Sequence, residues 1–265
     1  MLQRGAQAGV QVLQGDVLAF RQAVGSKQQL QPVGHATALF QRCLQVVDAF
    51  LLDGGKLRMG EAATYLVNDV EQSVFDDISV MPARILVVGL GNPTLTPDAL
   101  GPRTAERIKA TMHIREYDEE LFDALECSEI ATISPGVSAH TGLDTGVIIK
   151  AICEAISPDV VIAVDSLMTR SENRLGRTIQ ISDSGIFPGG LGNLKTPITR
   201  SGVGVPVIGI GVPTVISSRL LTNDLGDKPI LTEPHLLVPK NIDEITRVGA
   251  RVISGAINQA FGLDA

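Results

Sequence analysis

The alternation of apolar and polar positions divides the chain into a weakly patterned start and a regular remainder. Segments 10–24 and 36–52 have mixed apolar spacing that weakly favours helices, and the glycine pair at 54–55 marks a break. From residue 84 onward, short β-branched runs alternate with stretches of helical spacing. Strands buried on both faces of a parallel sheet have this continuous apolar character, so the pattern indicates an α/β protein.

The regular part predicts five strands and three helices. The predicted strands span residues 85–88, 128–133, 160–164, 177–181 and 205–210, and the predicted helices span residues 102–111, 143–156 and 241–261. Strands that alternate with helices favour a doubly wound, mostly parallel sheet with flanking helices, whose functional site lies beyond the carboxyl ends of the strands. We therefore expect an α/β catalytic domain at 81–265, preceded by a segment at 1–80 of unassigned structure that leaves room for a pro-segment.

Composition and charge exclude several classes of protein. The formal net charge is −7, which argues against a protein that binds nucleic acid through contacts with the phosphates. The three cysteines are widely spaced and form neither a metal-binding pair nor a disulfide framework, which is typical of a reducing compartment. The longest uncharged run, 201–218, is shorter than the roughly 20 residues of a membrane span. We expect a cytoplasmic protein with no direct nucleic-acid or membrane partner.

The first candidate for chemistry is Asp98, in the loop that leaves the first predicted strand. This loop reads GLGNPTLTPDALGP over residues 89–102. Its glycines permit turns that other residues avoid, and Pro97 stiffens the approach to Asp98. Aspartate is also a preferred residue at the start of a helix. Taken alone, Asp98 is therefore more simply interpreted as a helix cap than as a catalytic group.

The second candidate is Asp165, which directly follows the predicted strand 160–164. The carboxyl ends of parallel strands share one edge of the sheet, so Asp98 and Asp165 are expected at the same edge. Two adjacent carboxyl groups do not both ionise cheaply, and one can hold a proton while the other accepts one from water. The pattern equally allows Asp165 simply to bind the amides of a neighbouring loop.

Other motifs for nucleotide or metal chemistry match poorly. The dinucleotide fingerprint requires a glycine where Thr94 stands, and a phosphate loop over 189–196 has Leu194 in place of its glycine. The four histidines have no ligand spacing. Only His140 is expected near the strand edge, and no metal or cofactor is predicted.

A series of motifs in the second half of the chain resembles the germination protease family, the spore endopeptidases that cut small acid-soluble spore proteins. The motifs are VVGLGN (87–92), TPDALGP (96–102), SPGV (134–137), TGLDT (141–145), PDVVIAVDSL (158–167), IQISDSG (179–185), GLGN (190–193), GVPVIGIGVPT (204–214) and VPKNID (238–243). They follow the family's order over residues 84–262. The resemblance implies an atypical aspartic peptidase whose catalytic pair is Asp98 and Asp165.

The resemblance also implies a fold similar to that of hydrogenase maturation proteases. It further implies a homotetramer of the spore core, made as a zymogen, trimmed at its N-terminus and needing no cofactor. Residues 1–80 do not match the family's N-terminal region, which carries the processing site and part of the substrate groove. Weaker substrate-positioning roles are expected for Gly91, Asn92, Gly192, Asn193 and His140.

Three functions stay open at this point. The leading hypothesis is a metal-independent endopeptidase that degrades spore proteins with a water activated between Asp98 and Asp165. The second is a metal-dependent processing peptidase of the hydrogenase-maturation type, to whose metal site His140 would be the histidine contributor. The third is a relative without catalytic activity that binds spore proteins.

Overall fold

The computed structural model describes residues 66–67, 83–187, 196–218 and 235–263. The chain divides into two units, 1–34 and 35–265, and every described residue belongs to the second unit. The helices expected at 10–24 and 36–52 lie outside the described residues, as do Gly192 and Asn193. The domain boundary expected at residue 80 stays a prediction.

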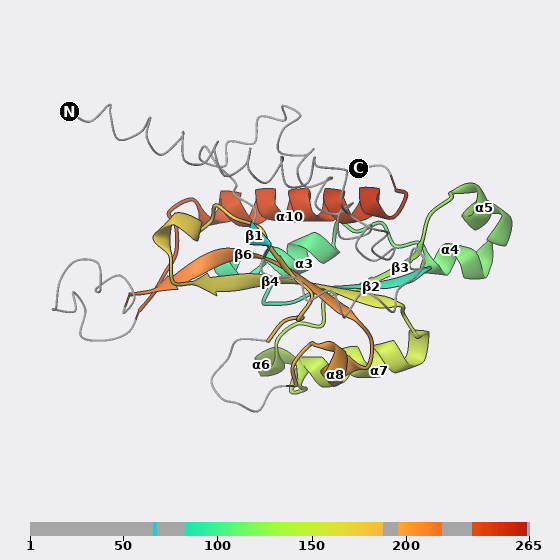
Figure 1. Ribbon diagram of the computed structural model, residues 1–265, viewed down its shortest axis with the longest axis horizontal. Coiled ribbons are helices and arrows are strands. Elements are labelled where there is room, and N and C mark those ends of the chain that lie inside the picture. Colours follow the sequence, from blue (N-terminus) through green and yellow to red (C-terminus); the bar gives the residue numbers. More distant parts are fainter. Residues whose placement is uncertain (1–65, 68–82, 188–195, 219–234, 264–265) are drawn as a thin grey trace, which may run out of the picture. The chain divides into compact units, whose positions relative to one another are not determined.

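One sheet of seven strands organises the described residues (Figure 1). Its strands are β1 (Leu66–Val67), β2 (Arg84–Gly89), β3 (Glu129–Ile133), β4 (Val160–Thr169), β5 (Gln180–Ser182), β6 (Val207–Ser217) and β7 (Leu236–Leu237). Their order is β1-β5-β6-β4-β2-β3, with β7 paired to β6. Pairing is parallel throughout except where β6 meets β5 and β7. The prediction of a mostly parallel α/β sheet is confirmed.

Helices cover both faces of this sheet (Figure 1). They are η2 (Thr96–Asp98), α3 (Leu100–Ala105), α4 (Met112–Tyr117), α5 (Glu119–Ala124), α6 (Ser138–Thr141), α7 (Thr145–Ile156), η3 (Glu172–Arg174), α8 (Arg200–Val203) and α10 (Ile242–Ala260). Helices α3 and α10 lie on one face, and α6, α7 and α8 lie on the other. The sheet is thus wound on both sides, as the alternating pattern predicts.

The strands are apolar on both faces because both faces are buried. Along β4, Val160, Ile162 and Val164 join a core cluster with residues of α10. The intervening Val161 and Ala163 join a second cluster with residues of α7. Alternate strand residues point to opposite faces, so each face of β4 supplies one layer of the core.

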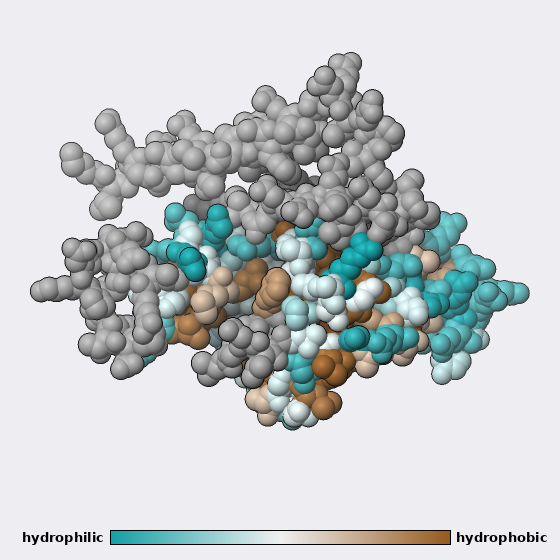
Figure 2. Space-filling view, turned by 60° about the horizontal axis from the view of Figure 1, so that its bottom comes forward, coloured by the Kyte–Doolittle hydropathy of each residue, from teal (hydrophilic) through white to brown (hydrophobic). Residues whose placement is uncertain are grey.

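Helix α10 confirms the long closing helix expected at 241–261. Its first turn buries Ile242 and exposes Asp243 and Glu244, whereas residues 252–258 are all buried. No described helix is long and apolar enough to cross a membrane. Figure 2 shows that hydrophilic side chains gather over the part of the molecule that carries α4 and α5.

Helix α3 is shorter than the helix expected at 102–111. It begins at Leu100 and ends at Ala105, where the N–H of Arg107 donates to the carbonyl of Thr104 in a tighter turn. This turn carries Ile108 into the core. Burial of an apolar side chain therefore overrides the helical spacing of the following residues.

Strand β4 is longer than the expected strand at 160–164, and this changes the position of Asp165 in the fold. Strand β2 ends where Gly89 pairs with Val164, but β6 continues to pair with β4 as far as Thr169. Asp165 is therefore a residue within a strand, just past the end of β2, rather than the first residue of a loop. The expected strands at 205–210 and 177–181 likewise become the longer β6 and the shorter β5.

Candidate active site

The loop between β2 and α3 closes on itself around Asp98. The N–H of Asn92 donates to Asp98 Oδ2 at 2.9 Å and lies 3.1 Å from the Asp98 carbonyl oxygen. Asn92 Oδ1 in turn accepts from the N–H and the hydroxyl of Thr94. Ala99, and not Asp98, is the N-cap residue of α3. Asp98 is therefore not the N-cap residue of α3, and its carboxylate accepts from the N–H of Asn92 in the loop.

Gly91 permits this closure. Its φ of +114° lies in the region that side chains disfavour, and an added Cβ would stand 2.0 Å from the Asp98 carbonyl oxygen. The structure thus accounts for Gly91 by the packing of the loop, and for the Asn92 N–H by its bond to Asp98. Substrate positioning by Gly91 and Asn92 stays a prediction.

A β-bulge in β6 anchors the loop to the sheet. Thr214 is the extra residue between Pro213, which pairs with Leu167, and Val215, which pairs with the next residue of β4. Its buried hydroxyl donates to the carbonyl of Pro97 at 2.8 Å. Bulges commonly redirect a side chain beside a functional site. Here the bulge holds the residue before Asp98 against the part of β6 that pairs with β4 just beyond Asp165.

Close backbone packing brings the same loop against the middle of β4, at Val164. The N–H of Leu90 donates to the carbonyl of Val164 at 2.8 Å. A Cβ added at Gly101 would stand 2.2 Å from the Leu90 carbonyl oxygen and 2.4 Å from that of Val164. Glycine is therefore required where α3 packs on β4 at Val164, one residue before Asp165.

Asp165 lies on the sheet face of Val161 and Ala163, because residues two apart along a strand share a face. Its Oδ1 atom accepts from the N–H of Ser166 at 2.8 Å. Its partner on β6 is Gly211, where an added Cβ would stand 2.6 Å from Leu167 Cγ. Both Asp98 and Asp165 are partly buried. Asp98 follows β2, and Asp165 lies in β4 one residue beyond the last that pairs with β2. A direct pairing of their carboxyl groups stays a prediction.

The sequence alone does not indicate that two further polar residues belong to this region. Thr214 is one, since nothing in its sequence context marks a bulge. Gln180 is the other: it pairs with Gly211, which pairs with Asp165, so Gln180 and Asp165 share a face across three strands. The alternation in segment 177–181 shows that Gln180 points away from the apolar side, but only the strand order shows what it faces.

His140 is exposed in the short helix α6, on the sheet face that also carries Asp165. Within the described part of the chain, no group of three or more His, Cys, Asp and Glu residues could hold a metal ion. Burial raises the pKa of the Cys153 thiol to about 11, so this thiol is protonated at neutral pH. Cys153 is a core residue of α7, with 4% of its surface exposed.

Much of this sequence matches a known protein family. The family model of the germination proteases matches residues 60–232, about two thirds of the chain. The chain belongs to the germination protease family. The match begins at residue 60 rather than at the expected 84, and it ends at 232 rather than 262. Both Asp98 and Asp165 lie within it.

Individual germination proteases are similar to this chain over different lengths. That of Oceanobacillus iheyensis is 44% identical over 64% of this chain and 46% of its own. That of Caldanaerobacter subterraneus is 38% identical over 76% of this chain and 59% of its own. That of Clostridium perfringens strain SM101 is 31% identical over 89% of this chain and 81% of its own. The chain therefore spans about half the length of the first two relatives.

Solved structures of hydrogenase maturation proteases resemble the chain more distantly. The protease HycI of Thermococcus kodakarensis is 19% identical, with a TM-score of 0.37, over 70% of this chain and 96% of its own. The endopeptidase HybD of Escherichia coli is 17% identical, with a TM-score of 0.35, over 66% of this chain and 93% of its own.

Proposed function

We propose that this protein is a germination endopeptidase that hydrolyses small acid-soluble spore proteins with a water activated between Asp98 and Asp165. Membership of the germination protease family supports peptidase activity. The observation that carries the choice of residues is the anchoring of the Asp98 loop, through Pro97 and Thr214, to the strand that pairs with Asp165.

In this mechanism the two carboxyl groups share one proton. The ionised group accepts a proton from water as the water oxygen bonds to the scissile carbonyl carbon, and the protonated group donates to the developing oxyanion. The C–N bond then breaks while the leaving nitrogen takes a proton from the pair. Each carboxylate accepts a backbone hydrogen bond, Asp98 from the N–H of Asn92 and Asp165 from that of Ser166. Either group can therefore act as the base while the other holds the proton.

The proposal extends to the assembly and control of the enzyme. In keeping with the family resemblance, we propose that the protein forms a homotetramer in the spore core. It is made as a zymogen and activated by removal of an N-terminal segment. Light scattering of the purified chain tests the tetramer. Mass spectrometry before and after activation tests the trimming.

The mechanism predicts that Asp98→Asn and Asp165→Asn each lower kcat by about 10² to 10⁴, the usual contribution of a general acid or base. Cleavage of a purified spore protein is followed by mass spectrometry, and circular dichroism verifies that each variant folds. The matched control is Asp159→Asn, which makes the same change just before the opposite end of β4. If either folded site variant retained full activity, the aspartate pair would be wrong.

A further inference from the structure

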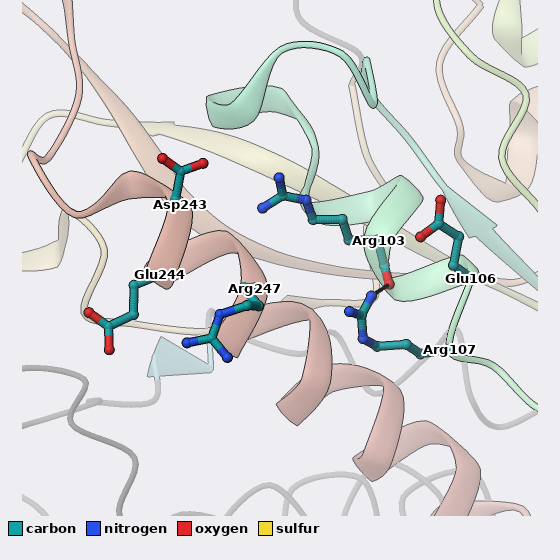
Figure 3. Close-up of a pocket in the computed structure, with 6 residues that line it drawn as sticks. All are labelled: Arg103, Glu106, Arg107, Asp243, Glu244 and Arg247. Carbon is teal, nitrogen blue, oxygen red and sulfur yellow. Dashed lines mark hydrogen bonds between the residues drawn. The ribbon is translucent and has the colours of Figure 1, made fainter.

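A second group of charged side chains lies between α3 and α10, on the sheet face opposite to that of Asp165 (Figure 3). Six residues line a cavity of about 590 Å³: Arg103, Glu106, Arg107, Asp243, Glu244 and Arg247. Pockets for small-molecule ligands commonly have volumes of roughly 300–1,000 Å³. The proposed mechanism does not use these arginines.

Two of the three guanidinium groups are held in place by the protein. Arg103 Nη1 donates to the hydroxyl of Thr246 at 2.6 Å, and Thr246 is fully buried in α10. Arg107 Nη1 donates to the carbonyl of Arg103, also at 2.6 Å. A guanidinium group carries five N–H donors, so each of these arginines keeps several donors for another partner. Their entropy loss on binding is correspondingly small.

The carboxylates of the cavity do not neutralise its arginines directly. No salt bridge joins any two of the six residues, all of which are described. Figure 3 shows the guanidinium groups between Glu106 on one side and the two acidic residues of α10 on the other. Asp243 and Glu244 belong to the first turn of α10, where negative charge stabilises the helix dipole. The presence of these two carboxylates is therefore explained by the helix dipole and does not require the arginines.

We propose that this cavity binds a small molecule that carries two or more phosphate or carboxylate groups. The guanidinium fork matches both kinds of oxyanion in bidentate geometry and stays charged at all physiological pH values. Three separate guanidinium groups favour a ligand with several oxyanions over one with a single charge. This inference does not depend on the proposed peptidase activity.

The test is isothermal titration calorimetry of the full chain with inorganic pyrophosphate and, separately, with citrate, each at constant ionic strength. We expect saturable binding of one molecule per chain by at least one of the two, and the stronger binder identifies the source of the oxyanions as phosphate or carboxylate. Absence of saturable binding by both would overturn the proposal.

Variants locate the binding in the cavity. Arg107→Gln and Arg247→Gln each remove an exposed guanidinium group and should weaken binding roughly tenfold or more, since a hydrogen bond to a charged group is lost. Glu244→Gln should strengthen it several-fold by removing a like charge. The matched control is Arg251→Gln, an exposed arginine one turn further along α10 and outside the cavity lining, which should leave the Kd unchanged. Equal weakening by Arg251→Gln would show that binding is not in this cavity.

Discussion

At the residue scale, the position of Asp98 depends on two neighbours that carry no chemistry of their own. Gly91 allows the loop to pass close to the Asp98 carbonyl, and Thr214 fixes the carbonyl of the preceding Pro97. A small displacement of a catalytic group strongly lowers the reaction rate, so both neighbours are expected to influence activity.

Gly91→Ala is expected to destabilise the fold and to lower activity. Alanine at a φ of +114° is strained, and its Cβ would clash with the Asp98 carbonyl at 2.0 Å, so we expect a loss of roughly 2–4 kcal/mol. The control is Gly204→Ala, because Gly204 has a φ of +88° but no atom within 4 Å of an added Cβ. Urea unfolding compares the two. Equal losses would show that backbone strain, and not the contact with Asp98, dominates.

Thr214→Val is expected to lower kcat about tenfold while KM changes little, because the loop that carries Asp98 loses its anchor. The half-buried Pro97 carbonyl also loses a donor, which costs about 1 kcal/mol of stability. Thr214→Ser keeps the hydroxyl and should restore kcat. A valine variant with wild-type kcat would show that the anchor does not position the loop.

At the element scale, α7 is joined to a segment far along the chain through its N-cap residue, Asp144. The Asp144 carboxylate accepts from the N–H of Val147 at 3.1 Å and from that of Thr196 at 3.3 Å. Burial acts to raise the pKa of Asp144, but the hydrogen bonds from Thr196 and Val147 outweigh burial and bring this pKa below its ordinary value of 3.8. The charged form of Asp144 is thus favoured by folding.

Asp144→Ala should therefore lower the free energy of unfolding at pH 7 by about 1 kcal/mol, as for other N-cap residues. A depressed carboxyl pKa contributes its stability above the unfolded value and loses it as the pH falls through the folded value. The difference between wild type and variant should thus be constant above about pH 4, near the ordinary carboxyl pKa, and shrink in stronger acid. Urea unfolding across this range measures it. The exposed Asp123→Ala is the control, expected to change stability by less than about 0.5 kcal/mol.

At the scale of the whole molecule, the proposed chemistry and the hydrogenase-maturation alternative differ in their need for a metal. A water activated between two carboxyl groups needs no metal, so cleavage of a spore protein should survive dialysis against EDTA. The measurement is kcat before and after dialysis, with a zinc peptidase as the positive control for chelation. Loss of activity that nickel or zinc restores would instead favour the metal-dependent processing peptidase.

The sequence by itself determined the α/β class, the central strands and the closing helix. It could do so because buried parallel strands and an amphipathic helix leave local apolar patterns at residues such as 85–88 and 241–261. The family followed from motifs that are also local. Local features also indicate the two aspartates, Asp98 through its motif and Asp165 through the apolar run before it.

Only the tertiary structure decided what surrounds those aspartates. The position of Asp165 within β4 depends on pairing with β6, more than 40 residues later, and the pairing of Gln180 with Gly211 depends on strand order. The bulge at Thr214 and the cavity between α3 and α10 are likewise made by segments distant in sequence. Such contacts leave no periodic signal in a single sequence, because their free energy is realised only when the segments meet.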